Sequence, residues 1–501
     1  MSQSPKSSTD FDVAVVGYGP TGATLANLLA LSGISVVVIE REAAVYHLPR
    51  AVHFDDEVMR VFQTVNIADA LSEKIHINPG MRFVDKTGRL LLDWPRPQEI
   101  GKHGWHSSYR LHQPDLEKLL RDQLELHASV CVVPNTIVEN TDEKTNGVRL
   151  DCRDKIDGTV SQIRANYVVG CDGARSTVRD AIGSGMEDLG FNERWLVVDL
   201  ILKHPMPGLG DHSIQYCDPE RPITYCRGPA NRRRWEVTLL PGETSDEMIR
   251  PERVWEFLSE WISPEDAIME RSAVYTFRSA LANTWRRGHL MIAGDAAHLT
   301  PPFMGQGMCT GIRDVSNLAW KLASVIHGEA DHELLDTYQA ERSPHARSYI
   351  MTAIKLGGLI NSLDQTSAQS LTDGNGGTRM ASISPSLGSV KYPGLELASS
   401  PLQGQVFGQV RLQNGLQTDD MVGYQPVVLS RFEPSTNKQT GIRVIYACQE
   451  PRVLAILDDH NIDAILLRPD RYVLATAKGQ KQVDALFQVQ LPHPHLQENR
   501  K

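Results

Sequence analysis

The segment from Asp12 to Glu40 constrains the fold of this chain more than any other part of the sequence. A short apolar run, Val13 to Val16, leads into a cluster of glycines, and leucines then recur at helical spacing before a second β-branched run, Ser35 to Ile39. The pattern predicts a buried strand, a tight turn, a helix that begins near Pro20, and a second buried strand. Such a βαβ unit is typical of a parallel sheet, so the segment indicates an α/β fold.

The three glycines, Gly17, Gly19 and Gly22, have the G-x-G-x-x-G spacing of a dinucleotide-binding turn. The first allows a sharp turn, the second lets the backbone touch a pyrophosphate, and the third lets the helix pack closely on the strand. The first helical N–H groups would point at the phosphates. Glu40 lies 18 residues beyond Gly22, where a carboxylate can accept hydrogen bonds from a ribose. The segment therefore predicts a bound dinucleotide.

The stretch from Val13 to Ile39 carries no charge and is also long enough to span a membrane. Against this alternative, the Gly19-Pro20 pair would break a spanning helix, and the periodicity changes along the stretch. We therefore favour the dinucleotide-binding interpretation.

The composition limits the class of protein. The chain has 501 residues and is 41% apolar, enough for two to four domains with cores of their own. A net charge of −10 without a long Lys/Arg run argues against nucleic-acid binding. The seven cysteines include no Cys-x-x-Cys pair, which is typical of reduced structural thiols. Residues 1–10 are polar and show no targeting pattern, so we expect a cytoplasmic protein that is not bound to a membrane.

Several segments between residues 41 and 180 predict further elements of the same fold. Acidic residues at 55–57 mark the start of a helix, and residues 81–94 are typical of a hairpin with a glycine turn. Leucines recur at helical spacing from Gln113 to His127. Residues 166–179 then repeat the sequence of buried strand, glycine turn and helix.

Residues 194–278 change in character. They contain strand-like segments broken by Pro, Gly and Asp, with one helical insert at 251–262, and predict a mostly antiparallel sheet. The segment at 289–298, with a buried strand that ends before Asp295, and a helix at 310–328 resume the first pattern.

These segments divide the chain into domains. We predict a dinucleotide-binding domain in three parts, residues 1–77, 107–188 and 281–365. A substrate domain is inserted into it, formed by a hairpin at 78–106 and by residues 189–280. Residues 366–404 are rich in Ser, Gly, Thr and Pro and are typical of a linker, and residues 405–495 predict a small α/β domain.

Two later motifs place polar groups where ligands bind in α/β sheets. Asp172 and Gly173 follow one predicted strand. Asp295 follows another, at the sheet edge where its carboxylate can accept hydrogen bonds from sugar-chain hydroxyls. Gly305 to Met308 offers backbone N–H groups at the start of a helix, which suits an electron-rich carbonyl or an anion.

Together these motifs resemble those of the single-component FAD-dependent aromatic hydroxylases, the group A flavoprotein monooxygenases. Within that family the chain is most similar to the branch of 3-(3-hydroxyphenyl)propionate hydroxylase and 2-hydroxybiphenyl monooxygenase. The resemblance covers nearly the whole chain. It rests on the fingerprint ending in Glu40-Arg41, PRAVHFDDEVMRVF (49–62), Asp172-Gly173, AGDAAH (293–298) and GIRDVSNLAWKL (311–322).

The resemblance implies an α/β fold with a Rossmann-like FAD-binding domain, an inserted, mainly antiparallel substrate domain and a thioredoxin-like C-terminal domain. It implies that Glu40 binds the adenosine ribose and that Arg50 and Gln113 lie along the pyrophosphate and ribityl region. Asp295 would hold the ribityl chain. Asp172 would touch FAD and assist NAD(P)H. The implied cofactor-binding residues are Gly17, Gly19, Pro20, Thr21, Gly22, Glu40, Arg41, Arg50, Gln113, Asp172, Gly173, Asp295, Pro302, Gly305, Gln306, Gly307 and Met308.

The resemblance also implies a reaction. NAD(P)H reduces FAD, O2 adds at flavin C4a, and the hydroperoxide passes OH to a phenolic ring. Pro301 and the backbone of residues 305–308 would border the isoalloxazine where oxygen reacts. The family has Asn at the position of Cys309, so this chain lacks that amide beside the flavin. The protein must exclude water and favour the phenolate, which requires a base near the phenol.

His53 is the first candidate for this base, because it follows Arg50 in the loop expected to line the ring pocket and its ordinary pKa suits the task. The alternative is a partly buried histidine without a catalytic role. Tyr216 and Tyr225 could hydrogen-bond the phenol, or could pack within their sheet. Residues Arg232–Arg234 could bind a substrate carboxylate, or could lie at a solvated strand end.

Two other patterns predict no chemistry of their own. His103, His106 and His112 lack a fixed ligand spacing and a Cys partner, so we expect no metal site. Residues 468–473 resemble the tail of the family's thioredoxin-like domain but lack a dithiol, so we expect a structural or assembly role.

The main hypothesis is therefore NAD(P)H- and O2-dependent hydroxylation of a phenol. A flavin halogenase or oxidase is an alternative, although the Trp-x-Trp-x-Ile-Pro motif of halogenases is absent. A flavin-binding regulatory protein without turnover is another. The sequence leaves open the ring substrate, the regiochemistry, the choice between NADH and NADPH, and the oligomeric state, for which a homodimer is one option.

Overall fold

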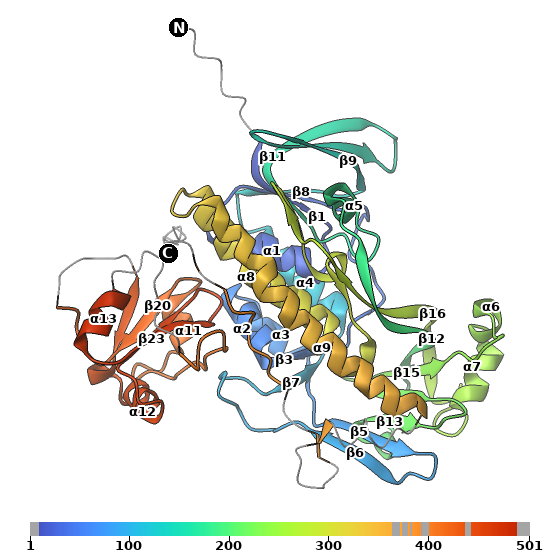
Figure 1. Cartoon of the computed structure of the whole chain (residues 1–501). Helices are drawn as coiled ribbons and strands as arrows, with labels where there is room; N and C mark the ends of the chain where they lie inside the picture. The colour runs from blue at the N-terminus through green and yellow to red at the C-terminus, as the bar shows by residue number, and fades with distance from the viewer. Residues whose placement is uncertain are drawn as a thin grey trace.

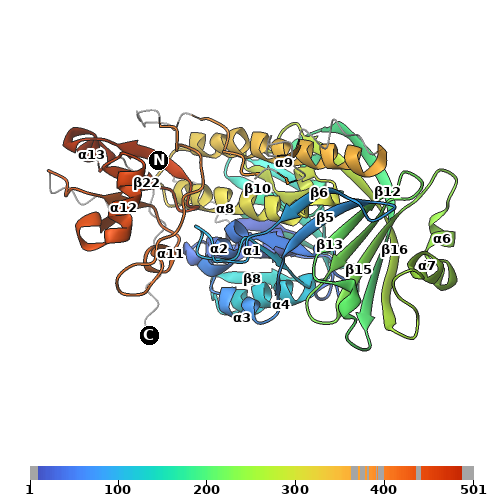
Figure 2. The same ribbon diagram turned by 90° about the horizontal axis from the view of Figure 1, so that it is seen from below.

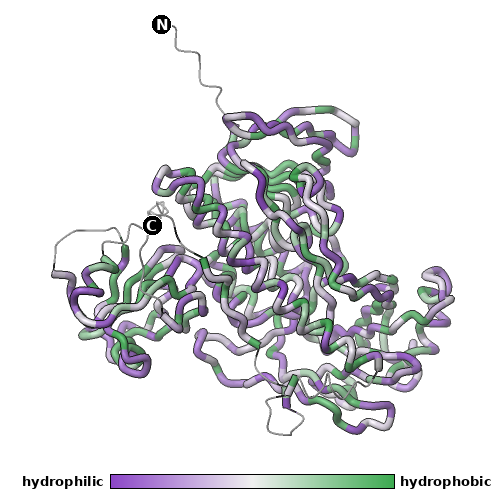
Figure 3. The backbone as a smooth tube through the Cα atoms, in the orientation of Figure 1, coloured by the Kyte–Doolittle hydropathy of each residue, from purple (hydrophilic) through white to green (hydrophobic). Residues whose placement is uncertain are grey.

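Two large sheets lie side by side in the computed structural model, with long helices across them and a separate C-terminal α/β unit at one side (Figures 1 and 2). The structure describes residues 10–362, 371–372, 379–380, 383–390, 392, 400–435 and 442–487. Hydrophobic residues concentrate in the central strands and helices, whereas the outer hairpins are more polar (Figure 3). Among the described residues, no helix combines the length and the apolar character needed to cross a membrane.

The first sheet is built around the predicted βαβ unit. Its strands β1 and β2 are parallel, with Val13 opposite Val36, and α1 (Pro20–Leu31) connects them, which confirms the predicted order of elements. The sheet order is β17 (Arg286–Arg287), β18 (Leu290–Ile292), β11 (Val160–Gly170), β1 (Phe11–Val16), β2 (Val36–Ile39) and β8 (Val130–Val133), with β10 (Gly147–Asp154) and β9 (Thr136–Lys144) attached through β11.

Helices cover this sheet. Most apolar side chains of α1 are buried, and Leu25 and Leu28 are fully so. The helix packs against α8 (Gly307–Ile326) and α4 (Gln113–Leu124). The helix predicted at 310–328 is α8, which begins three residues earlier than predicted, at Gly307. The other helices near this sheet are α2 (Asp56–Thr64), α3 (Ala68–Ser72), α5 (Thr177–Ile182), η4 (His332–Leu335) and α9 (Asp336–Ser362).

The second sheet is mostly antiparallel, as predicted for residues 194–278, and it includes the early hairpin. Its order is β19 (His298–Leu299), β16 (Ala267–Ala282), β12 (Met186–Leu202), β15 (Arg232–Thr238), β14 (Ile223–Arg227), β13 (Ser213–Cys217), β5 (Gly80–Asp85) and β6 (Leu90–Pro95). One face packs on α9 and on η3 (Pro302–Met304), through Phe303, Trp195 and Tyr349. The other face packs on α7 (Pro251–Leu258), which follows α6 (Ser245–Met248) in the chain. The short helix η1 (Pro207–Leu209) precedes β13.

The strand predicted before Asp295 is β18, and the chain leaves the first sheet directly after it. β18 ends at Ile292, Gly294–Ala296 forms the 3-10 turn η2, and His298 already pairs with Leu281 in the second sheet. The physical reason is the glycine at 294, whose φ of +63° turns the chain out of the strand. A small third sheet, β3 (His53–Asp55), β7 (Ser108–Arg110) and β4 (His76–Ile77), lies between the two large ones.

The C-terminal unit has its own four-stranded sheet and core. The strand order is β21 (Arg443–Tyr446), β20 (Val427–Ser430), β22 (Ala464–Leu467) and β23 (Val473–Ala477), with α11 (Thr418–Val422), η5 (Ala447–Gln449), α12 (Pro451–Asp459) and α13 (Gln480–Leu486). Its thioredoxin-like character and the domain boundaries stay predictions. Much of the predicted linker at 366–404, and residues 488–495, lie outside the described residues.

Candidate active site

The glycine turn after β1 leaves room for a ligand at one position only among its three glycines. A Cβ on Gly17, whose φ is +101°, would lie 2.4 Å from the Cys171 carbonyl oxygen, and a Cβ on Gly22 would lie 2.0 Å from the Gly17 carbonyl oxygen. A Cβ on Gly19 would meet nothing within 4 Å. Gly17 and Gly22 are therefore required for packing, whereas Gly19 borders open space at the start of α1, where Pro20 occupies the first turn.

The carboxylate of Glu40 is held at the end of β2 by the backbone. Its Oε2 accepts from the Tyr18 N–H at 2.6 Å, and its Oε1 accepts from the Glu42 N–H at 2.8 Å. Glu40 is 9% exposed. Arg41 is exposed and forms an ion pair with Glu42, so it points away from the buried carboxylate.

Gln113 shapes the loop that follows β2. Its Oε1 accepts from the backbone N–H groups of Arg50 and Ala51, at 3.1 and 2.6 Å, while its Nε2 donates to Glu117. The Arg50 side chain is exposed. Gln113 therefore positions Arg50 through the main chain.

Thr21 brings three of the predicted motifs together. A Cβ on Gly294 would lie 2.9 Å from the Thr21 hydroxyl, and a Cβ on Gly311 would lie 2.6 Å from it. The fingerprint helix, the turn before Asp295 and helix α8 therefore meet at this side chain. Asp295 itself is exposed beside this junction.

Asp172 keeps one unused acceptor. Its Oδ2 accepts from the Thr177 N–H at 2.8 Å, near the start of α5, but Oδ1 is buried without a donor among the described residues. Burial raises the pKa of this carboxyl. Gly173 follows in the left-handed region, with φ +81°, and a Cβ there would meet nothing within 4 Å. A buried acceptor that lacks a donor beside open space fits a ligand that donates hydrogen bonds.

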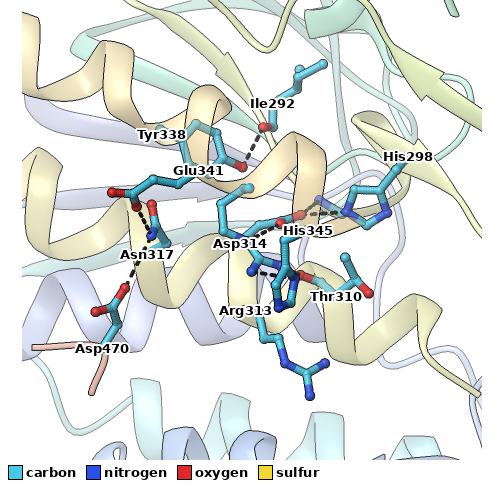
Figure 4. Close-up of polar contacts among 12 residues, drawn as sticks. Ile292, His298, Thr310, Arg313, Asp314, Asn317, Tyr338, Glu341, His345 and Asp470 are labelled. Atoms are coloured by element: carbon cyan, nitrogen blue, oxygen red, sulfur yellow. Dashed lines mark hydrogen bonds and ion pairs between the residues drawn. The ribbon is translucent and has the colours of Figure 1, made fainter. Parts of the chain in front are cut away.

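A buried ionic network on α8 and α9 supports the Asp295 turn (Figure 4). Asp314 accepts from the Gly294 N–H at 3.1 Å, and also contacts His298 at 2.6 Å and Arg342 at 3.0 Å. Burial opposes the charge of Asp314, but His298 and Arg342 hold its pKa below its ordinary value. The carboxylate is therefore ionised, and it fixes the backbone immediately before Asp295.

His53 lies against the loop that precedes α8. Its Nδ1 is 3.3 Å from the Gly305 carbonyl oxygen, so this nitrogen carries the hydrogen, and its Nε2 accepts from the Ser108 hydroxyl at 2.7 Å. Asn78 donates to the same Ser108 oxygen at 2.8 Å. Burial, followed by Arg110 and Arg96, lowers the pKa of His53 to about 3. The imidazole is therefore neutral, and it is a much weaker base than its ordinary pKa suggests.

The loop that precedes α8 is also connected to the C-terminal unit by side-chain contacts. Gln306 donates to Asp55 at 3.1 Å and accepts from Arg313 at 3.0 Å, and Arg313 pairs with Asp55 and Glu57 at 2.5 Å each. The Tyr472 hydroxyl donates to Glu57 at 2.5 Å. These five side chains form a continuous polar chain, named here the Tyr472–Gln306 relay.

The remaining loop residues sit as neighbours of this region. Pro301 is buried, Pro302 begins η3, and Met308 is half-buried in the first turn of α8. A Cβ on Gly307 would meet nothing within 4 Å. Cys309 is fully buried with Sγ 3.6 Å from the Gly305 carbonyl oxygen, and burial raises its pKa, so it is a neutral thiol.

The two tyrosine candidates lie elsewhere. Tyr216 packs on Trp261 at 5.0 Å between ring centroids, and Tyr225 packs on Trp235 at 5.0 Å. Both belong to the cluster under α7, on the sheet face opposite η3. The structure therefore does not bring them together with His53, and their position agrees with the packing alternative.

The histidine cluster forms no metal site in the described part of the chain, where no group of three His, Cys, Asp or Glu could hold an ion. His103 contacts Asp56 at 3.0 Å, and His112 contacts Asp115 at 3.1 Å.

These features fit FAD on structural grounds. Three features follow the carboxyl ends of the neighbouring strands β1, β11 and β18: open space at Gly19, the unused Asp172 acceptor and the exposed Asp295. His53, at the start of β3, packs against the loop before α8. The fold and site therefore define a dinucleotide-binding flavoprotein with a second sheet beside its cofactor site. The solved complex of aklavinone-11 hydroxylase with FAD and aklavinone shares this fold, with a TM-score of 0.79 at 22% identity, over 96% of this chain and 99% of that one.

Sequence comparisons identify the family. A model of the FAD binding domain matches residues 10–353. A probable NADH-specific resorcinol 4-hydroxylase of Rhodococcus jostii is 35% identical over 502 residues, which cover 95% of this chain and 93% of that protein. A 3-(3-hydroxy-phenyl)propionate/3-hydroxycinnamic acid hydroxylase of Paraburkholderia xenovorans is 38% identical over 341 residues, or 68% of this chain; the match spans only 54% of that relative.

The chain belongs to this family of FAD-binding proteins, and the resemblance to the FAD-dependent aromatic hydroxylases is confirmed. FAD is its cofactor, and its enzyme class is that of the FAD-dependent monooxygenases.

Sequence reasoning missed several buried polar residues, among them Arg110, Arg313, Asp314 and Tyr472. A signal existed for three of them, because Arg313 and Asp314 belong to the motif at 311–322 and Tyr472 to residues 468–473, which the resemblance singled out without giving these side chains a role. Arg110 gave no signal, since its partner Ser213 is distant in sequence.

Proposed function

We propose that the protein hydroxylates a phenolic substrate with O2 and with NADH or NADPH as the electron donor. When bound, FAD supplies the reduction of O2 and the transfer of one oxygen atom to the ring. The whole-chain similarity to a resorcinol hydroxylase supports the reaction class. A cytoplasmic location and a homodimer stay predictions.

The observation that carries the proposal is the contact between His53 and the Gly305 carbonyl. It places a neutral, hydrogen-bonding side chain at the junction of the second sheet and the loop before α8. Ser108 is bonded to His53 and has an oxygen that already accepts from Asn78. A phenol would donate to the second lone pair of Ser108 Oγ, and its proton would pass to Ser108 as the hydroxyl hydrogen of Ser108 moves to Nε2 of His53.

The residues around the cofactor have proposed roles that follow from their geometry. Glu40, fixed by two N–H groups, would accept from the adenosine ribose. Asp172 would use its free Oδ1, and Asp295 would hold the ribityl hydroxyls. The buried Pro301 and the 305–308 backbone would border the flavin ring and exclude water.

The test is NAD(P)H oxidation by the flavin-loaded enzyme, with and without each member of a panel of phenols. We expect one or more phenols to accelerate oxidation and to yield a catechol or hydroquinone, with little hydrogen peroxide. Oxidation that yields only peroxide would instead identify an oxidase, and a halogenated product a halogenase. No response to any phenol would favour a binder without turnover.

A further inference from the structure

Arg110 is a buried cation without a carboxylate partner. It stands directly opposite His53 in the β3–β7 pair, so both side chains lie on the same face. It is 6% exposed, its guanidinium donates to the Ser213 hydroxyl at 2.5 Å, and its Nε has no acceptor. No ion pair joins it to any described residue. Because an unpaired buried charge is costly, this arrangement calls for a ligand.

Arg96 is a second such cation at the same place. It directly follows β6, and its guanidinium lies over the ring of Trp94, 4.0 Å from the ring centroid. Within the described part of the chain, its guanidinium forms no hydrogen bond or ion pair. The Arg96 N–H donates to the Pro79 carbonyl at 3.0 Å, and the adjacent Asn78 donates to Ser108, which is bonded to His53. Arg96 therefore lies near His53 and Arg110, and the charges of both arginines lower the pKa of His53.

The acids near this region are already committed. Asp199 pairs with Arg234 at 2.7 Å and also with Arg271. Glu236 lies 3.7 Å from Arg234, and burial raises its pKa. Asp55 and Asp56, whose charges act on Arg96, are also committed: Asp55 pairs with Arg313, and Asp56 contacts His103. Within the described residues, Arg110 and Arg96 therefore have no carboxylate of their own. In the run at 232–234, Arg232 pairs with Glu270 and Arg234 with Asp199, and whether this run binds a substrate carboxylate stays a prediction.

We infer that Arg96 and Arg110 bind an anionic oxygen of the aromatic substrate, beside His53 and against the Trp94 ring. Guanidinium groups suit this task because their fixed donors match a carboxylate or a phenolate oxygen. The anion could be a carboxylate on the ring's side chain or the phenolate itself. That the ligand is aromatic and is hydroxylated rests on the proposed function, whereas anion binding does not.

An anion bound by Arg96 and Arg110 would also raise the pKa of His53. A bound anion would offset the two positive charges that depress its pKa, so the imidazole becomes more basic when the substrate is present. In the free protein, a pKa of about 3 makes His53 a poor proton acceptor, and the bound anion would make it a better one.

The experiment measures binding to the FAD-loaded enzyme by calorimetry without NADH or NADPH, so that no probe is converted during the measurement. One pair is 3-phenylpropionate and its neutral amide, 3-phenylpropanamide. The other is 4-nitrophenol, in buffer alkaline enough to ionise it, and its neutral methyl ether. We expect at least one anion to bind about tenfold or more tightly than its neutral partner.

The variants Arg110→Met and Arg96→Met should each weaken the preferred anion by about 10- to 100-fold and leave the neutral partners unchanged. Arg110→Lys should retain part of the preference. Arg89→Met, at the exposed tip of the same hairpin, is the matched control and should change nothing. Because Met replaces a cation without a carboxylate partner, the melting temperature of Arg110→Met should stay level or rise; Arg96→Met provides the test if Arg110→Met does not fold.

The outcomes are distinct. Preference for 3-phenylpropionate identifies the substrate as an aromatic acid, and preference for 4-nitrophenolate identifies phenolate binding; either supports the inference. Equal binding of both anions and their neutral partners overturns it, as does a preference that survives in both Met variants. Failure of the proposed hydroxylation would appear instead in the turnover assay, independently of these affinities.

Discussion

His53 makes stability depend on pH in a direction that can be tested. Its pKa is about 3 in the folded protein and about 6.5 when unfolded. Below pH 6.5 the unfolded chain takes up a proton that the folded chain refuses, so stability falls as the pH falls from about 6.5 towards 3. Between pH 7 and pH 5 this group alone costs about 2 kcal/mol of unfolding free energy.

We expect the His53→Gln variant to lose this component. Urea unfolding at pH 7 and pH 5 should show a drop that is about 2 kcal/mol smaller in the variant than in the wild type. The exposed His204 provides the control substitution, His204→Gln, which should keep the wild-type dependence. An identical pH dependence in His53→Gln and wild type would mean that His53 is not held neutral.

His53→Gln should also slow hydroxylation, because glutamine cannot take up the phenol proton. We expect kcat to fall by about 100-fold, within the usual range for a general base, with a smaller change in KM for the phenol. Steady-state turnover with the best phenol of the panel measures this. An unchanged kcat would show that the base lies elsewhere.

Among the elements, the turn between β1 and α1 separates cofactor binding from folding. A Cβ on Gly19 meets no protein atom, whereas a Cβ on Gly22 overlaps the Gly17 carbonyl. Gly19→Ala should therefore keep the melting temperature of the apoprotein but weaken FAD binding by about tenfold or more. Gly22→Ala should lower the apoprotein's stability by about 1–3 kcal/mol and lose FAD as well.

Flavin fluorescence titration and thermal melting of the two apoproteins provide the measurements. If Gly19→Ala bound FAD as tightly as the wild type, the open space beside Gly19 would not be the pyrophosphate position.

In the molecule as a whole, the Tyr472–Gln306 relay joins the C-terminal unit to the loop at the proposed flavin edge. Tyr472→Phe removes the hydrogen bond to Glu57 and should reduce stability by about 1–3 kcal/mol. Because the relay ends at Gln306, we also expect a looser loop and a smaller fraction of NAD(P)H oxidised to hydroxylated product, with the balance as peroxide.

Tyr446→Phe, a half-buried tyrosine on β21 of the same unit, is the matched control and should leave that fraction unchanged. If Tyr472→Phe kept the wild-type ratio of product to peroxide, the C-terminal unit would be a neighbour of the active site without influence on it.

Local patterns predicted the βαβ unit, its glycines and the carboxylate after β2, because those features depend on residues within one short segment. The mostly antiparallel sheet also followed from strand-like segments and turn residues. The same patterns could not predict which face of that sheet packs on α7 and which packs on η3 and α9. Tyr216 and Gln215 necessarily lie on opposite faces, but only the packing of α7 decides that Tyr216 is the one beneath it.

The electrostatics of the site could not be predicted, because they arise between residues far apart in sequence. Glu57 and Tyr472 are 415 positions apart, and His53 and Gly305 are 252 apart. The neutral state of His53 depends on Arg96 and Arg110, which approach it only after three sheets have formed. The sequence predicted His53 as a candidate base, which stays a prediction, but assigned it the basicity of an isolated side chain.

The switch of the chain between sheets at the Asp295 turn has a mechanical consequence. Ile292 is hydrogen-bonded within the first sheet and His298 within the second, so only five residues connect them, and the Asp314 carboxylate clamps that connection. This short, hydrogen-bonded connection holds the two sheets together beside the proposed cofactor position. We therefore expect the two sheets to keep their relative orientation when a substrate binds, so that the movements that admit it are confined to surface loops.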